Sequence, residues 1–136
     1  MEACLNQDRT IFIRETISGI NLTQGDFSDR RLIDSTLQSF KLQEGSCRYL
    51  RAQGTRFQNF SIDHALCDQG RYQDCAWANV EVRNSLLTGS HFSGCTFEAT
   101  VGELSSFGLS VFSNCKFQGS RLNEVSFSGA WWHNCG

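Results

Sequence analysis

Seven of the 136 residues are cysteines, enough thiols to bind a metal ion or to form disulfides. Six of them recur at intervals of twenty residues, as the pair Cys47 and Cys67 and as the row Cys75, Cys95, Cys115 and Cys135. Zinc sites commonly use a Cys-x-x-Cys pair, which the sequence lacks, and thiols in a straight row cannot surround one ion tetrahedrally. The cysteines therefore predict no metal site.

The three histidines, His64, His91 and His133, are the other candidates for chemistry. None of them has a nucleophile at the spacing of a known catalytic motif. His64 follows Asp63, and an exposed pair at the surface explains this neighbour better than a catalytic dyad does. The sequence also contains no P-loop and no dinucleotide fingerprint. We therefore expect a protein that is not an enzyme and that uses no cofactor.

The elements that carry these residues follow from a hydrophobic period of five. An apolar or small residue occupies every fifth position from Phe12 to Trp132, and 21 of these 25 central sites carry a large apolar side chain. A period of five fits neither the 3.6 residues of a helical turn nor the two of a strand. Each repeat must therefore turn a corner and return one side chain to a common interior.

The other sites of the repeat are also regular. The site two residues before each central residue is mostly small, and the remaining three are mostly polar. Ser93–Phe97 and Ser113–Phe117 show this pattern, with Cys95 and Cys115 at the small site. In this pattern, over about residues 10–135, the chain resembles the pentapeptide-repeat family. The resemblance implies an all-β fold: a right-handed, four-sided parallel β-helix of about six coils, with four repeats in each coil.

A second period of twenty residues fits four repeats per coil. It relates Phe40 to Phe60, and it relates Arg31, Arg51 and Arg71 to one another. Equivalent residues then form columns along a rod, with neighbouring coils about 4.7–4.9 Å apart.

The stacking of coils also predicts whether the cysteines form disulfides. Equivalent side chains of successive coils point the same way, so disulfides between stacked cysteines are not expected. We expect Cys75, Cys95 and Cys115 to be small buried core residues. Reduced thiols favour a cytoplasmic location, and so does a sequence without a signal peptide or a run long enough to span a membrane.

The repeat predicts one domain, because the sequence contains no proline and no Gly/Ser-rich linker. Residues 1–9 fall outside the pattern and are expected to cap the first coil, while residues 10–136 form the pentapeptide-repeat domain. Two places depart from the pattern. Leu50 and Ala52 invert the small-then-large order, so we expect Leu50 to fill the core beside Ala52. Gly102 predicts a thin spot or a bulge in the core, and Leu104 or Leu109 could compensate by leaning inward.

The predicted faces differ in charge, although the whole chain has a net charge of −2. The face that contains Phe12, Leu32 and Ala52 has a net charge of +3. Its charged residues are Arg14, Arg30, Arg31, Arg51 and Arg71 against Asp34 and Asp74. Two of the other faces are each net −2 and the last is neutral. The rod is therefore expected to be positive on one side and negative on another.

Arg31, Arg51 and Arg71 occupy the same outward site in three consecutive coils, and two explanations are open. Arg31 could pair locally with Asp34, and Arg71 with Asp74. Alternatively, the three arginines bind an anionic partner, because a guanidinium recognises carboxylate or phosphate through two hydrogen bonds. Nucleic acid is the weaker candidate for that partner, since the chain has no dominating basic field and no aromatic stacking platform.

The C-terminal stretch carries two adjacent tryptophans, Trp131 and Trp132, and no polar cap. Repeat arrays normally need such a cap, so we expect this end to be an interface. The expected contact is a two-fold dimer made end to end, or otherwise a junction with a second chain or a missing domain. The alternative is that the last coil simply tolerates the exposure of its aromatic side chains.

Because function is expected at the surface, the sequence favours a non-catalytic protein-interaction scaffold of bacterial origin, with a protein partner of unknown identity. The resemblance implies two further possibilities. One is a DNA-mimicking protein that binds a type II topoisomerase such as gyrase and protects it from quinolones or toxins, since Cys or Ser before Phe is typical of that branch. The other is the docking module of a secreted effector or adaptor.

Overall fold

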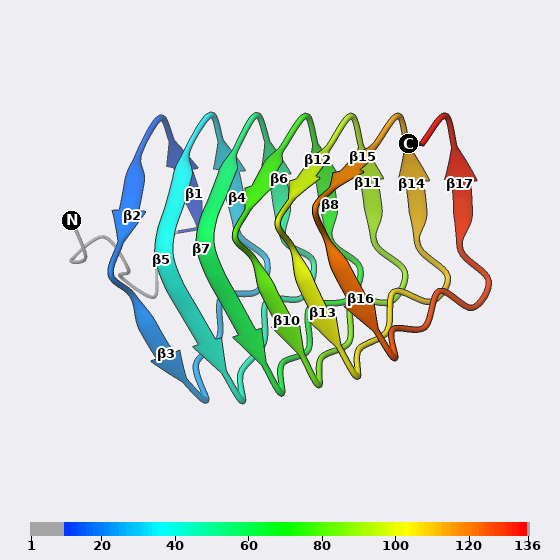
Figure 1. The fold of residues 1–136 in the computed structure, drawn as a ribbon. Helices are drawn as coiled ribbons and strands as arrows, with labels where there is room; N and C mark the ends of the chain where they lie inside the picture. Colours follow the sequence, from blue (N-terminus) through cyan, green and yellow to red (C-terminus); the bar gives the residue numbers. More distant parts are fainter. Residues whose placement is uncertain (1–9, 136) are drawn as a thin grey trace.

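The computed structural model describes residues 10–135, so the predicted cap over residues 1–9 lies outside the described residues. The described residues form a parallel β-solenoid of about six coils, which confirms the predicted fold class. Figure 1 shows the coils stacked side by side from the N-terminal to the C-terminal end. No helix among these residues is long and apolar enough to cross a membrane.

One face of the solenoid is a seven-stranded parallel sheet in the order β1-β4-β6-β8-β11-β14-β17. Its strands are β1 (Ile11–Ile13), β4 (Arg31–Ile33), β6 (Arg51–Gln53), β8 (Arg71–Gln73), β11 (His91–Ser93), β14 (Val111–Ser113) and β17 (Trp131–His133). Each strand pairs with the strand exactly one twenty-residue coil away, so that Arg31 lies opposite Arg51. The predicted period of twenty is therefore the register of this sheet.

Two further faces belong to one ten-stranded sheet. Its strands are β2 (Thr16–Ser18), β3 (Asn21–Thr23), β5 (Thr36–Gln43), β7 (Arg56–Asp63), β9 (Ala76–Ala78), β10 (Glu81–Arg83), β12 (Thr96–Glu98), β13 (Val101–Glu103), β15 (Lys116–Gln118) and β16 (Arg121–Asn123). The eight-residue strands β5 and β7 run across the corner that separates the two faces elsewhere. Phe40 and Phe60 are buried at that corner, with ring centroids 5.0 Å apart.

The fourth face is held by single bridges that repeat every twenty residues. They join Asp26, Ser46, Leu66, Leu86, Ser106 and Ser126 in that order. With the other three faces, this column completes a four-sided cross-section.

The corners are formed by residues in the left-handed region of φ. They recur two positions after each central site, from Arg14 (φ 51°) to Asn134 (φ 53°). Asn, Asp and Gly tolerate this conformation best, and they are frequent there. Gly54 has a further reason to be glycine, because a Cβ atom there would meet the Asp34 carboxylate of the preceding coil.

The core is the column of central residues. From Phe12 to Phe112 they are buried, except for the half-buried Leu22. Aromatic rings stack along the axis, as in Tyr72 on Phe92 (centroids 4.9 Å apart) and Phe92 on Phe112 (4.8 Å). Stacked rings of this kind add to the stabilisation from burial alone.

Both predicted departures from the repeat can be compared with the structure. Leu50 and Ala52 are both buried, which confirms that Leu50 fills the core there. Leu104 and Leu109 are exposed and do not lean in at Gly102, so that expectation is wrong. Leu122 and Val125 side chains of the next repeats lie beside Gly102 instead, because β13 keeps its regular register there.

Candidate functional site

Among residues 10–135, no group of three or more His, Cys, Asp or Glu side chains could hold a metal ion. His64 Nδ1 lies 2.8 Å from the Asp63 carboxylate as an exposed pair, as the sequence predicted.

The arginine column, Arg31, Arg51 and Arg71, lies on strands β4, β6 and β8 of the seven-stranded sheet. All three side chains are exposed. The register places His91 of β11 next to Arg71 in the same column. Sequence reasoning missed His91 as a member, although its spacing of twenty from Arg71 was a sufficient signal.

Local pairing does not explain the column. Within residues 10–135, no ion pair joins Arg31 to Asp34 or Arg71 to Asp74, and none involves Arg51. The Asp34 and Asp74 carboxylates instead lie over the glycines of the next coil. Both aspartates are corner residues with positive φ, and their carboxylates extend toward the next coil. The local-pairing explanation is therefore wrong.

Two arginines on the other faces, Arg48 and Arg83, are compensated by carboxylates. Arg48 Nε lies 2.7 Å from the Asp68 carboxylate, and Arg83 Nη1 lies 2.7 Å from Glu103. In both pairs the carboxylate lies exactly one coil beyond the arginine. The residue one coil beyond Arg31, and likewise beyond Arg51, is another arginine, so like charges stack at the spacing of the coils. Two unit charges about 5 Å apart repel by about 1 kcal/mol in bulk water, and by more near a protein surface.

A groove with a volume of about 420 Å³ runs beside the column. Successive side chains of a strand point to opposite faces, so each strand contributes two outward side chains and one inward. The column and His91 line one wall, Gln53, Gln73 and Ser93 line the other, and Leu32, Ala52 and Tyr72 lie beneath. Burial raises the pKa of Tyr72, which keeps its phenol neutral below the arginines.

We predict that Arg51→Gln, the change at the middle of the column, raises the free energy of unfolding at low salt by up to about 1 kcal/mol. The gain should fade at high salt, where screening weakens the repulsion that the substitution removes. Denaturant unfolding at both salt concentrations measures it. Arg48→Gln is the control and should destabilise the fold, because it breaks a pair. A loss of stability in Arg51→Gln at low salt would show that the column is already compensated.

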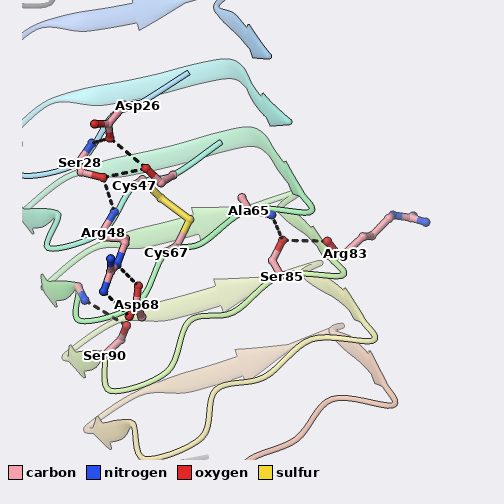
Figure 2. Close-up of a disulfide and its surroundings, with 12 residues drawn as sticks. Asp26, Ser28, Cys47, Arg48, Ala65, Cys67, Asp68, Arg83, Ser85 and Ser90 are labelled. Carbon is pink, nitrogen blue, oxygen red and sulfur yellow. Dashed lines mark hydrogen bonds and ion pairs between the residues drawn. A yellow bond between two sulfur atoms is a disulfide. The ribbon is translucent and has the colours of Figure 1, made fainter. Parts of the chain in front are cut away.

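Cys47 and Cys67 form a disulfide, which corrects the expectation that stacked cysteines would not bond. Their Cα atoms lie 4.6 Å apart, so stacking by itself provides a separation that a disulfide can span. Figure 2 shows the two sulfur atoms turned toward each other between neighbouring coils, near the Arg48–Asp68 pair. The earlier expectation failed because side chains at equivalent sites can adopt different rotamers.

The other cysteines of the described region are free thiols, and Cys75, Cys95 and Cys115 are buried as predicted. Their sulfur atoms contact backbone carbonyls, as Cys115 does with Phe92 (3.4 Å). The interaction with the neighbouring Cys95 thiol, followed by burial, raises the pKa of Cys115. The Cys115 thiol is therefore held in the unreactive form.

The predicted dimer surface lies on the last described coil. Trp131 is 75% exposed, and Trp132 is 46% exposed although its ring stacks on Phe112 with centroids 4.4 Å apart. The inward direction of Trp132 and the outward direction of Trp131 agree with the repeat. Dimerisation itself stays a prediction.

Sedimentation tests that dimer. We expect the parent protein to sediment as a dimer at tens of micromolar, and Trp131→Asp to sediment as a monomer, because a carboxylate would lose its water in the contact. A monomeric parent removes the dimer, and a dimeric variant places the interface elsewhere.

The fold and the column define a solenoid of pentapeptide repeats with a cationic groove on one face. Comparison of the sequence with models of known protein families finds no match, and comparison with curated proteins finds none. Solved structures with a similar fold include pentapeptide-repeat proteins. Rfr23 from the cyanobacterium Cyanothece 51142 is 14% identical, with a TM-score of 0.42 over 90% of each chain.

Two other solved structures have a similar fold. A trypsin-treated variant of QnrB1, a plasmid-mediated fluoroquinolone resistance protein, is 15% identical, with a TM-score of 0.45 over 93% of this chain and 72% of that one. HetL, a pentapeptide repeat protein involved in heterocyst differentiation regulation in Nostoc sp. strain PCC 7120, is 9% identical, with a TM-score of 0.25 over 90% of this chain and 87% of that one. These similarities concern the fold alone.

Proposed function

We propose that the chain is a non-catalytic protein-binding module whose arginine column docks on an acidic segment of a partner protein. The observation that carries this proposal is the stack of three exposed arginines without an ion pair among residues 10–135. An acidic partner would supply the negative charge that these arginines lack. Binding would also relieve the repulsion between the arginines, which adds to the binding free energy.

Affinity capture from bacterial lysate tests the proposal. The column variant carries Arg31→Gln, Arg51→Gln and Arg71→Gln. The matched control carries Arg56→Gln, Lys116→Gln and Arg121→Gln, which removes the same charge from exposed sites on other faces. We expect proteins captured by the parent and by the control to be lost from the column variant. Capture should also weaken as salt increases. If the column variant retains every partner, the column is only a solvated surface.

Topoisomerase binding is the second candidate. The style of the repeat supports it, because Cys95 precedes Phe97 and Cys115 precedes Phe117. The charge of the rod does not support it. Some carboxylates of the negative faces already pair with arginine, as Asp68 does, so a continuous DNA-like acidic surface is not available there. Gyrase supercoiling and relaxation assays test this candidate: no effect at micromolar protein would remove it.

The cellular location of the protein is proposed from the state of its cysteines. The cytoplasmic location expected from free thiols stays a proposal, and the Cys47–Cys67 disulfide is more typical of an oxidising compartment. A docking module of a secreted effector would use the same arginine column in that setting. Fractionation of cells that express the complete natural gene distinguishes the two locations.

A further inference from the structure

The two walls of the groove beside the arginine column differ in chemistry. One wall is cationic because it presents Arg31, Arg51 and Arg71, and His91 follows them in the same column. The other presents the side-chain amides of Gln53 and Gln73. No described residue forms a hydrogen bond with either amide, and both side chains are exposed. A ligand in the groove therefore meets guanidinium groups on one side and free amides on the other.

The amide wall favours a peptide over a phosphate chain. A glutamine amide has two donor hydrogens and an acceptor oxygen, so it can bond both to the carbonyl and to the N–H of a peptide backbone. A phosphate chain offers acceptors only and would leave the glutamine oxygens without a donor. The cationic wall then selects the side chains, because arginine binds carboxylates through two parallel hydrogen bonds.

The N-terminal end of the groove is apolar. Ile33 lines it, and Ile13 of the preceding coil lies directly opposite Ile33 in the register, 49% exposed. An apolar side chain at one end of a ligand would cover this pair.

The length of the groove limits the ligand. From β4 to β11 it spans three coil intervals, roughly 14 Å, which an extended peptide of about four or five residues covers. The backbone groups of these strands bond to neighbouring coils, as Arg51 N does to Arg30 O (2.9 Å). The peptide is therefore recognised by side chains rather than by strand addition.

Resting on the proposed function, we infer that the groove binds a short acidic peptide in extended conformation. Its carboxylates contact the arginine column, its backbone contacts Gln53 and Gln73, and an apolar residue at one end covers Ile13 and Ile33. The partner is thus a protein with a linear segment of alternating acidic residues next to an apolar one.

Fluorescence anisotropy with synthetic probes tests this inference. The first probe is the labelled peptide Ile-Glu-Ser-Glu-Ser-Glu, its uncharged counterpart has Gln for each Glu, and inorganic polyphosphate is the third ligand. We expect the acidic peptide to bind the parent at low salt and the Gln peptide to bind at least about tenfold more weakly. The column variant should lose about tenfold or more in affinity for the acidic peptide, and the matched control variant should not.

A second variant, Gln53→Ala with Gln73→Ala, separates a peptide site from a general anion site. The variant should bind the acidic peptide about three- to tenfold more weakly than the parent does, and its affinity for polyphosphate should be unchanged, because only the peptide uses the amides. Thermal unfolding of each variant confirms that it folds. Equal binding of the two peptides, or equal loss of peptide and polyphosphate binding in the glutamine variant, would overturn the inference. If capture from lysate still depends on the column while the peptide does not bind, this inference fails and the proposed function stands.

Discussion

Leu50→Ala is expected to lower the free energy of unfolding by about 2–5 kcal/mol. Leu50 is fully buried at a site that is small in most repeats, and it fills the space that Ala52 leaves in the same coil. Its truncation would leave a cavity in the core, and the hydrogen-bonded coils above and below cannot close around it. Denaturant unfolding of the parent and the variant measures the difference.

The matched control is Leu109→Ala. Leu109 is 71% exposed, so its truncation should change stability by less than about 0.5 kcal/mol. A cost at Leu50 as small as that at Leu109 would mean that Leu50 points to solvent.

Reduction of the Cys47–Cys67 disulfide is expected to cost about 3 kcal/mol of stability, because the bond closes a twenty-residue loop in the unfolded chain. Denaturant unfolding with and without reductant measures this cost. The control is Cys115→Ser, which leaves the disulfide in place and should respond to reductant as the parent does. Mass spectrometry of the protein alkylated without prior reduction checks the bond itself. Alkylated Cys47 and Cys67 would show that the disulfide is absent.

The fold could be predicted because the sequence repeats one physical requirement many times. Phe12, Phe57 and Phe112 lie in one unbroken phase of five, so a single interior accounts for all of them. The twenty-residue register followed from the columns of arginine and cysteine, since equivalent residues of a solenoid stack.

The period of five did not predict the backbone conformation of the corners. Each coil turns through left-handed residues such as Asn59 and Asn84, and Asn, Asp and Gly at that site were a visible signal. Tyr49 and Leu104 adopt the same conformation without being suited to it, so the backbone of the coil overrides local preference.

Side-chain orientation was beyond prediction for the candidate site. The sequence placed Asp34 within reach of Arg31, yet the corner geometry directs its carboxylate toward Gly54. The bond between Cys47 and Cys67 likewise depends on rotamers that no spacing determines. The column itself was predictable, whereas its lack of compensation required atomic positions.

The guanidinium Nε–Hε signals in the NMR spectrum of the ¹⁵N-labelled parent test most directly whether the arginine column binds acidic segments. During titration with the peptide Ile-Glu-Ser-Glu-Ser-Glu, we predict that the signals of Arg31, Arg51 and Arg71 shift together and saturate. Those of Arg48 and Arg83 should stay in place, because these side chains are already paired. Shifts confined to arginines outside the column, or no shift at saturating peptide, would contradict the account.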